Sequence, residues 1–214
     1  MVLEIISVCL KRNKRIIFDN FNLKINKSQI MILIGDNGVG KTSLLDLVAG
    51  ILPPEKGTIK INNKSIINLN SDKRKIFTYL PHKDALKENL TIEENLKIWS
   101  SISFEKFSYK KLQSIFDYFH LKNIKQNLVG NLSQGQRKKV SLTKLLLTNT
   151  KLWLLDEPFN GLDSNSVKKT KKLIENHLMN GGSTLLTNHI NLNLKNSKKT
   201  FLVDPTNNLA NKKH

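Results

Sequence analysis

A buried strand, a glycine-rich loop and a helix follow one another in the first quarter of the chain. The strand is a continuous apolar run, IMILIG, at Ile30–Gly35, and it has the length of a strand that is buried on both faces. The loop is GDNGVGKT at Gly35–Thr42, and the spacing after it predicts a helix over Lys41–Ala49 that ends at Gly50 and Pro53–Pro54. This order of elements is typical of an α/β sheet with a glycine-rich turn at its edge.

The glycine-rich loop has the spacing of a phosphate-binding loop. Its glycines allow backbone N–H groups to point at phosphate oxygens, assisted by the N-terminus of the following helix. Lys41 is expected to reach the β- and γ-phosphates of a nucleotide, and the Thr42 hydroxyl is expected to hold Mg²⁺. We therefore predict an ATP-binding loop formed by Gly35, Asp36, Asn37, Gly38, Val39, Gly40, Lys41, Thr42 and Ser43.

Two adjacent carboxylates end a second apolar strand, in LWLLDEPFNGLD at Leu152–Asp163. A buried carboxylate is costly unless a cation or a proton donor lies against it. Asp156 is therefore expected to lie beside the phosphate-binding loop and to bind Mg²⁺, and Glu157 to polarise the water that attacks the γ-phosphate. A strand that ended in an ordinary polar turn would need neither this pair of carboxylates nor the phosphate-binding loop.

The rest of the chain alternates between strand and helix patterns. From about Leu90 to Thr148 the apolar residues recur at helical spacing, and Trp99, Phe116 and Phe119 are interpreted as core rather than as a ligand-binding box. Strands interleaved with helices indicate an α/β sheet, and the middle third indicates an inserted helical subdomain. Further strands are expected near Phe21–Asn26, Gly57–Asn62, Lys75–Leu80, Ser183–Thr187 and Thr200–Val203, and a helix near Ser164–Met179.

Composition restricts the partners less than the net charge suggests. The 214 residues, 39% of them hydrophobic, suffice for one domain or for a domain that carries a subdomain. A net charge of +18 fits a nucleic acid partner, but 31 of the 35 basic residues are Lys. Because Asn is also abundant and both residues have A/T-rich codons, we favour genome composition as the cause, and attraction to an anionic membrane surface next.

Three further exclusions follow from the sequence. No apolar run approaches the roughly 18–20 residues that a membrane-spanning helix needs. The segment after Met1 alternates like a strand, so we expect no secretory signal. Cys9 is the only cysteine, which excludes disulfides within the chain and metal sites made of cysteine alone.

The segment LSQGQ at Leu132–Gln136 precedes the Asp156 strand and opens a helix. Ser133 and Gln136 have the spacing of a capping box, and taken alone the segment would be interpreted as a helix cap. Together with the phosphate-binding loop, it resembles the LSGGQ signature of ABC-type ATPases, with Gln134 at a position that is usually glycine. In the same order, Asn160–Asp163 resembles the D-loop, and His189 resembles the switch histidine that contacts the γ-phosphate.

This resemblance covers nearly the whole chain and implies a fold and an assembly. It implies a single ABC ATP-binding domain over residues 1–214: an α/β P-loop ATPase core, an N-terminal antiparallel β subdomain and an inserted helical subdomain at about 83–150. In this family the signature of one copy completes the ATP site of another. Ser133, Gly135 and Gln136 are therefore expected to contact the nucleotide of a second copy, so the chain must form a homodimer to hydrolyse ATP.

Two positions depart from the usual pattern of the family. His82 follows the YLP strand end where ABC ATPases usually have Gln, and by this resemblance it is expected to be catalytic, as are Glu157 and His189. The N-terminal region offers Arg12 where many members stack an aromatic ring on adenine. A guanidinium can also stack on a base, so Arg12 is expected to contact the nucleotide.

These departures, together with LWLLDEP and GGSTLLTNH, resemble the haem-exporter (CcmA) family of ATP-binding subunits in cytochrome c maturation. That resemblance implies the membrane partners CcmB, CcmC and CcmD, and ATP hydrolysis linked to release of the haem-loaded chaperone CcmE. It also implies a place on the cytoplasmic face of the bacterial inner membrane or, alternatively, the matrix face of the mitochondrial inner membrane. His120 and His177 are isolated, so any haem contact is assigned to the partners.

Two other functions are compatible with these motifs. One is an ATPase for another small exporter of drugs, lipids or ions. The other is an ABC protein that acts on ribosomes or DNA, which the net charge would suit. Proteins of that second class usually carry two ATPase units or a long coiled-coil insertion, and this sequence shows neither. We therefore expect no nucleic acid partner.

Overall fold

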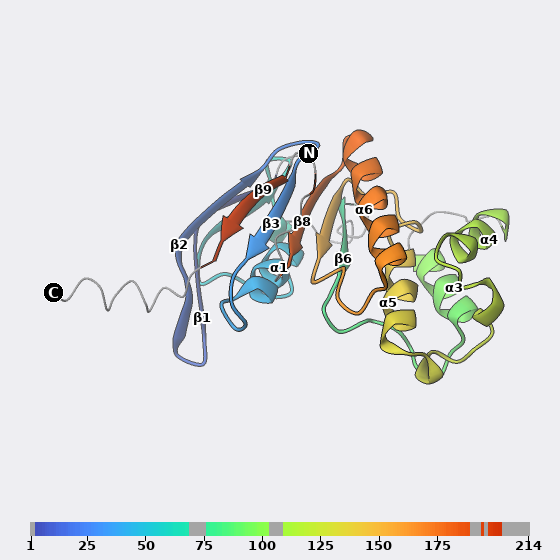
Figure 1. Ribbon diagram of the computed structural model, residues 1–214. Coiled ribbons are helices and arrows are strands. Elements are labelled where there is room, and N and C mark those ends of the chain that lie inside the picture. Colours follow the sequence, from blue (N-terminus) through green and yellow to red (C-terminus); the bar gives the residue numbers. More distant parts are fainter. Residues whose placement is uncertain (1–2, 69–75, 103–108, 189–193, 195–196, 203–214) are drawn as a thin grey trace.

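The computed structural model describes residues 3–68, 76–102, 109–188, 194 and 197–202 (Figure 1). Two sheets organise this part of the chain. One has four strands in the order β2-β1-β4-β5, and the other has five in the order β6-β7-β8-β3-β9. The chain thus has the α/β architecture that the alternating strand and helix patterns predict.

All neighbouring strands of the five-stranded sheet are parallel. The carboxyl ends of its strands therefore lie at one edge, where the loops after them can converge. The glycine-rich loop follows β3, His82 lies just after β6, and Asp156 follows β7 directly. The strands are β3 (Ile30–Ile34), β6 (Phe77–Leu80), β7 (Leu152–Leu155), β8 (Ser183–Thr187) and β9 (Ser197–Phe201).

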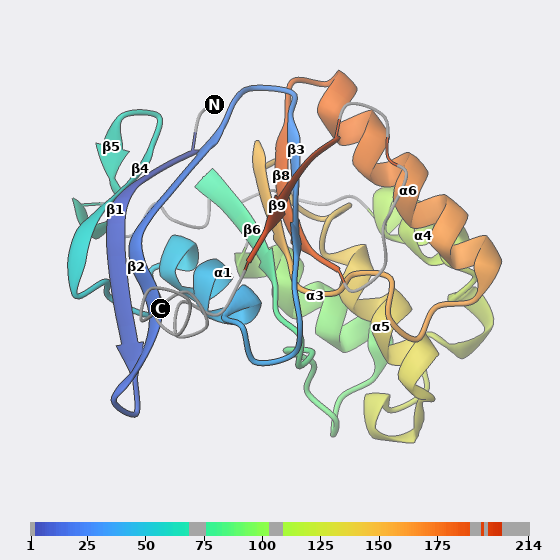
Figure 2. The same cartoon turned by 60° about the vertical axis from the view of Figure 1, so that its left-hand side comes forward.

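Both faces of this sheet are buried, which explains the continuous apolar runs in its strands. One face packs on α1 (Lys41–Ala49) and the four-stranded sheet in one apolar cluster, and Figure 2 shows α1 between the two sheets. The other face packs on α5 (Gln134–Thr143) and α6 (Ser164–Met179). In β7, for example, Leu154 joins the first cluster and Trp153 joins the second, because successive side chains point to opposite faces.

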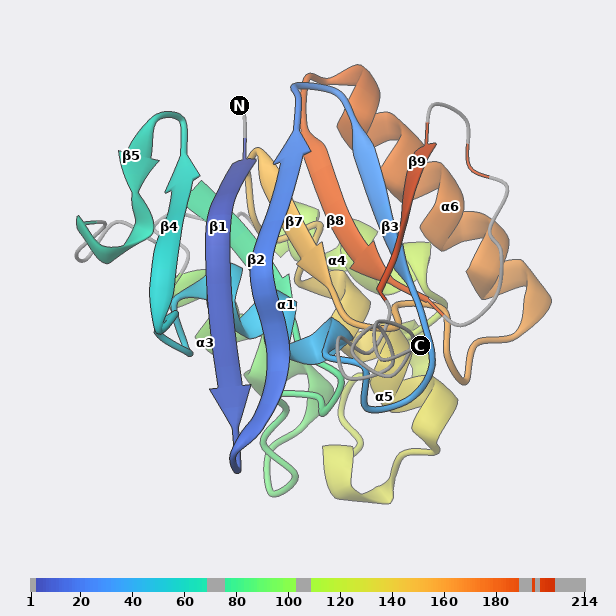
Figure 3. The ribbon, with the colours of Figure 1, turned by 90° about the vertical axis from the view of Figure 1, so that its left-hand side faces the viewer.

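The four-stranded sheet is antiparallel and irregular (Figure 3). The register of β1 with β2 shifts at several points, and Asn20 of β2 has a positive φ of 53°. For β2, the sequence predicted only the part near Phe21–Asn26, because these irregularities interrupt the alternation upstream of it. The strands are β1 (Leu3–Arg12), β2 (Arg15–Ile25), β4 (Lys56–Ile61) and β5 (Lys64–Ser65).

The helical segment between β6 and β7 contains α3 (Ile92–Ile102), α4 (Tyr109–Tyr118) and α5. Phe116 and Phe119 are 0% and 1% exposed in the apolar cluster beneath these helices. The interpretation of these aromatic residues as core is therefore confirmed. Short 3-10 helices lie at Ile66–Asn68, Lys122–Ile124 and Val129–Asn131.

The last strand differs from its predicted position. The sequence predicted a strand near Thr200–Val203, but β9 spans Ser197–Phe201. It is an edge strand that pairs with β3 from Ile30↔Ser197 to Ile34↔Phe201. Its sequence, SKKTF, is mostly polar and partly exposed, so backbone pairing rather than an apolar pattern determines where it begins.

Two other features of the described part bear on the earlier exclusions. None of its helices is both long and apolar enough to cross a lipid bilayer. Cys9 is a free thiol in β1, half-buried, with its sulfur near the carboxylate of Asp19.

His177 of α6 stacks on Trp153 of β7. Their ring centroids are 3.7 Å apart with an interplanar angle of 4°, and His177 Nε2 lies 3.3 Å from the main-chain oxygen of Ser183. A Cβ at Gly182 would lie 2.2 Å from the imidazole, so the ring occupies the space that glycine leaves. Burial lowers the pKa of His177 from 6.5 to about 4.

This stacked histidine predicts a loss of stability in acid. The unfolded imidazole binds a proton near pH 6.5 and the folded one only near pH 4, so stability falls as the pH drops between these values. Allowing for partial exposure, we expect about 1–2 kcal/mol less unfolding free energy at pH 5 than at pH 7 from this group. In urea titrations, His177→Phe should remove that part of the pH dependence.

The matched control is His120→Asn. His120 is exposed and has a positive φ of 57°, which Asn tolerates. This variant keeps the stacked ring of His177, so it should retain the loss of stability in acid that is assigned to that ring. Equal pH dependence in wild type and His177→Phe would contradict the assignment of the acid sensitivity to the stacked ring.

Candidate active site

The glycine-rich loop closes over the start of α1. Gly38 and Gly40 have φ values of 80° and 107°, a region that favours glycine. A Cβ at Gly40 would lie 2.5 Å from Ile17, so this position also lacks room for a side chain. Gly40 is the N-cap of α1 and provides no side-chain hydrogen bond, so the first N–H groups of the helix are left for a ligand.

Lys41 lies beneath this loop and is 7% exposed. Its Nζ donates to the main-chain oxygens of Gly35 at 2.6 Å and Asp36 at 2.9 Å. An ammonium group has three protons, so these two bonds orient the side chain and leave a third proton for an anionic ligand. The Lys41 ammonium group thus holds the loop in this conformation.

A cavity of about 260 Å³ lies over the loop. Lys41 and Thr42 line it together with Glu157, which comes from a distant part of the chain. Arg12 lines it from the end of β1, and its Nη1 donates to Ser43 Oγ at 3.4 Å. The remaining lining residues are Ile17, Asn37, Gly38, Gly40 and Ser43.

Asp156 is 1% exposed at the carboxyl end of β7. Thr42 Oγ1 donates to its Oδ2 at 2.8 Å, and Thr187 Oγ1 donates to its Oδ1 at 2.6 Å. Its backbone N–H donates to the oxygen of Leu80 at 2.9 Å, which fixes it between β6 and β7. A hydroxyl and a carboxylate this close, both hard oxygen donors, fit a Mg²⁺ ion, which would also offset the cost of the buried charge.

Glu157 has a strained backbone and a constrained side chain. Its φ is 47°, which is uncommon for a residue with a Cβ and is typical of functional sites. Its N–H donates to Thr187 Oγ1 at 2.9 Å, and its side chain is 12% exposed. His82 Nδ1 lies 3.3 Å from Glu157 Oε2, and Asn160 Nδ2 donates to the same oxygen at 3.4 Å.

The signature segment forms the capping box that its spacing predicts. Gln136 N donates to Ser133 Oγ at 3.2 Å, and Ser133 N donates to Gln136 Oε1 at 2.9 Å. A Cβ at Gly135 would lie 2.8 Å from the oxygen of Gly161, so α5 begins against the D-loop segment. Ser133, Gly135 and Gln136 do not line the cavity over the phosphate-binding loop.

The sequence motifs assigned no role to three residues that contact Asp156 or Glu157. Thr187 bonds to Asp156 and to the backbone of Glu157, Asn160 contacts Glu157, and Lys138 Nζ lies 3.4 Å from the main-chain oxygen of Asp156. Thr187 could have been found, because it ends a strand of the same parallel sheet. His189, the expected switch histidine, lies outside the described residues.

Comparison with known proteins identifies the family. The family model for ABC transporters matches residues 18–160. The chain is 36% identical to the cytochrome c biogenesis ATP-binding export protein CcmA of Reclinomonas americana over 92% of this chain and 88% of that protein. CcmA of Nitrosomonas europaea is also 36% identical, over 85% and 84%. The chain belongs to the CcmA family of ABC transporter ATP-binding proteins.

Solved structures agree with an ABC-type fold. An ABC transporter ATP-binding protein of Pyrococcus furiosus superposes with a TM-score of 0.81 at 26% identity, over 94% of this chain and 98% of that one. A dimeric ATP-binding cassette with ADP and Pi bound superposes with a TM-score of 0.83 at 20% identity, over 94% of both chains. The ABC ATPase fold is thereby confirmed. Membership of the family makes the chain an ATP-hydrolysing subunit of a transporter.

Thr187 is predicted to be required for turnover. Thr187→Val keeps the shape of the side chain but removes the donor to Asp156 and the acceptor for the Glu157 N–H. We expect kcat for ATP to fall by about 10–100-fold, because the Asp156 carboxylate and the Glu157 backbone lose their positioning bonds, with KM changed far less. Steady-state ATPase assays measure both constants.

Thr187→Ser is the matched control, since it retains the hydroxyl and should keep most of the activity. Thermal unfolding of all three proteins separates a positioning effect from a loss of fold. A folded Thr187→Val protein with the wild-type kcat would contradict the role of this hydroxyl.

Proposed function

We propose that this chain is the ATP-hydrolysing subunit of an ABC transporter for cytochrome c biogenesis, which exports haem or releases the haem-loaded chaperone CcmE. One observation carries the ATPase part: Lys41, Thr42 and Glu157 line a single cavity, although Glu157 is more than a hundred residues away in the sequence. The names of the curated relatives support the biogenesis part. They do not favour the alternative of a drug, lipid or ion exporter.

The residues at the cavity have different roles in ATP hydrolysis. Lys41 and the N–H groups at the start of α1 bind and orient the phosphates. Glu157 accepts the proton of the attacking water, while His82 and Asn160 hold its Oε2 in place. His189 stays a prediction as a further catalytic residue.

Thr42 and Asp156 are the residues that would hold Mg²⁺. Thr187 keeps the Asp156 carboxylate oriented through its bond to Oδ1, so Oδ2 faces the Thr42 hydroxyl. When bound, Mg²⁺ neutralises charge on the β- and γ-phosphates. Arg12 stacks on the base, since it reaches the cavity from β1 and is anchored to Ser43.

The active assembly is a homodimer. Ser133, Gly135 and Gln136 lie at the start of α5 and outside the phosphate cavity of their own chain, which suits a contact with the nucleotide of a second copy. ABC ATPase structures are dimeric, as in the cassette with ADP and Pi bound. We assign residues 1–214 to one ABC domain, with residues 83–150 as its helical subdomain.

The transporter partners are CcmB, CcmC and CcmD, and CcmE is linked functionally. As an ATP-binding subunit of a membrane transporter, the chain is peripheral to the membrane, and we place it on the cytoplasmic face of the bacterial inner membrane. The matrix face of the mitochondrial inner membrane is the alternative. We assign haem handling to these partners, because the sequence has a single cysteine, Cys9, and therefore no Cys-x-x-Cys-His haem-attachment motif.

Glu157→Gln tests the proposed ATPase. The variant keeps Asp156 and the phosphate-binding loop but loses the carboxylate that accepts the proton of water. We expect Mg²⁺–ATP to bind with near wild-type affinity, turnover to fall by at least about 100-fold, and ATP to accumulate in a dimer of doubled mass. Light scattering with ATP, and analysis of the bound nucleotide, measure this.

Lys41→Ala is the matched negative control for that experiment. It removes the cation under the loop, so we expect ATP affinity to fall strongly and the chain to stay monomeric with ATP. Hydrolysis at the wild-type rate in Glu157→Gln, or unchanged ATP affinity in a folded Lys41→Ala protein, would overturn the assignment of the site.

His82 is predicted to couple hydrolysis to the membrane subunits. It is half-exposed on the segment after β6 and contacts Glu157, so a force on that segment reaches the catalytic carboxylate. His82→Ala should reduce the ATPase rate stimulated by the membrane subunits about tenfold, more than the basal rate or ATP binding. ATPase assays with and without the membrane subunits measure the difference.

His82→Gln is the control, because it restores the usual residue of ABC ATPases and a hydrogen-bonding group. It should keep most of the stimulated rate. If His82→Ala lowers the basal and stimulated rates equally, or lowers neither, His82 is not a coupling residue.

A further inference from the structure

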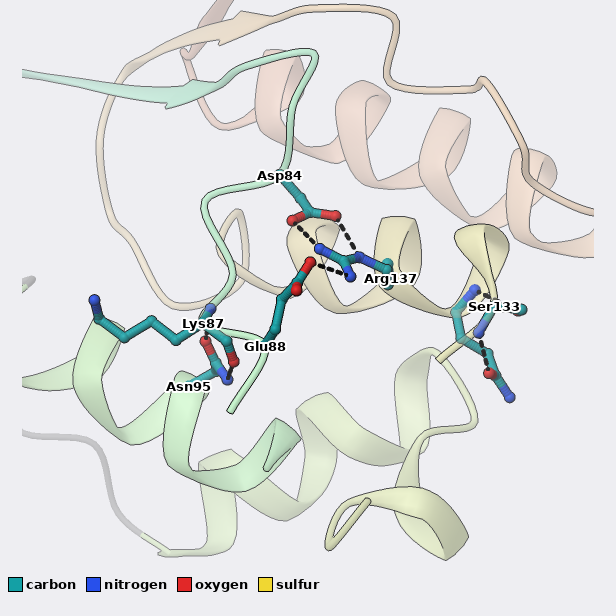
Figure 4. A network of polar contacts seen from close by, with 7 residues as sticks. Asp84, Lys87, Glu88, Asn95, Ser133 and Arg137 are labelled. Atoms are coloured by element: carbon teal, nitrogen blue, oxygen red, sulfur yellow. Dashed lines mark hydrogen bonds and ion pairs between the residues drawn. The ribbon is translucent and has the colours of Figure 1, made fainter. Parts of the chain in front are cut away.

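Arg137 holds two acidic residues of the segment that follows β6. Its Nε and Nη2 donate to Asp84 Oδ2 and Oδ1, both at 2.9 Å, and its Nη1 donates to Glu88 Oε1 at 2.8 Å (Figure 4). The side chains of Arg137 and Asp84 are 22% and 21% exposed, whereas Glu88 is 67% exposed. The two-pronged pair with Asp84 is therefore the directional and less screened part of this contact.

Hydrogen bonds to its main chain also attach this segment to the helical part of the chain. We call residues 81–90 the bridging segment. Asn95 of α3 accepts from the N–H of Lys87 at 2.8 Å and donates to its oxygen at 3.1 Å (Figure 4). Gly130 N donates to the oxygen of Glu88 at 2.9 Å, three residues before the cap of α5 at Ser133.

The opposite end of the bridging segment lies beside Asp156 and Glu157. Leu80, just before it, accepts the N–H of Asp156 at 2.9 Å, and His82 lies 3.3 Å from Glu157 Oε2. Asp84 follows His82 by two residues, and Arg137 follows the signature residue Gln136 directly. A chain of short contacts thus runs from Glu157 to the start of α5 within one copy.

We propose that Arg137 is a positioning residue. Its two hydrogen bonds to Asp84 join the bridging segment and the start of α5 into one unit, so that His82 contacts Glu157 only when the signature residues are correctly placed. The inference rests on the proposed role of His82. It goes beyond that role, because it names the side chain that connects His82 to the surface a second copy would contact.

The geometry of the guanidinium carries this inference. A Lys at position 137 would keep the charge but could not form two parallel bonds to one carboxylate. Backbone bonds through Gly130 and Asn95 attach the far part of the bridging segment, so Asp84 is the side chain nearest His82 that α5 holds. Loss of the hydrogen bonds from Arg137 to Asp84 should let His82 move away from Glu157 without unfolding the helices.

The first test is a double-mutant cycle on the ATPase stimulated by the membrane subunits. Arg137→Gln should lower the stimulated kcat about tenfold, with KM for ATP within about twofold of wild type. The stimulated kcat of Arg137→Lys should lie between those of wild type and Arg137→Gln. In the His82→Ala background the same change should cost less than about twofold, because Arg137 acts through His82.

Two controls accompany the cycle. Lys97→Gln removes a 2.8 Å ion pair with Glu93 on α3 and leaves the bridging segment unaltered, so kcat should stay within about twofold of wild type. Lys41→Ala reports separately whether the ATPase itself is assigned correctly. Independent losses in the two single variants, or a lower affinity for ATP in Arg137→Gln, would overturn the positioning role even if the ATPase assignment stands.

A second test needs no ATPase activity. Spin labels at Lys83→Cys and Asn131→Cys, both exposed positions, report the distance between the bridging segment and the turn before α5. The full-length Cys9→Ser chain provides the background, because Cys9 is the only cysteine. Arg137→Gln should broaden a narrow distance distribution, and Arg137→Lys should broaden it partly. An unchanged distribution in Arg137→Gln overturns the proposal.

Discussion

The burial of the Asp156 carboxylate is the constraint on which the site depends. At 1% exposure this charge needs partners, and the hydroxyls of Thr42, in the first turn of α1, and of Thr187, at the end of β8, provide them. The parallel order of β7, β8 and β3 brings both hydroxyls to the carboxylate. The same sheet places Glu157, one residue later, at the cavity that Lys41 lines.

The elements that were best predicted are those whose limits are set by local sequence signals. The helices at Lys41–Ala49 and Ser164–Met179 and the strand at Ser183–Thr187 agree with the predicted ranges, because caps and apolar runs are local signals. The strand LWLL was also evident, since burial on both faces leaves only apolar residues in it. Irregular β2 and the polar edge strand β9 were misplaced, because pairing with β1 and β3 decides their limits.

The residues that support the site were harder to predict, since each comes from an element distant in sequence. Motif spacing indicated Lys41, Asp156 and Glu157, but the bond from Thr187 to Asp156 depends on the order of strands in the sheet. Arg137 and Asp84 are 53 residues apart in the sequence, and their hydrogen bonds depend on how α5 packs against the bridging segment. The capping box at Ser133 was predictable because both of its bonds are local.

The capping box and the signature motif are therefore two interpretations of the same segment, Leu132–Gln136, and both can hold. Within the chain, Ser133 and Gln136 satisfy each other and fix where α5 begins, and close contact of Gly135 with Gly161 sets that start against the D-loop. In the proposed homodimer, this fixed helix start presents its backbone to the second copy. By the positioning role proposed for Arg137, the next residue, a shift of that start is transmitted to Asp84 and from there toward His82 and Glu157. The two proposals together link assembly and hydrolysis through neighbouring residues of one helix.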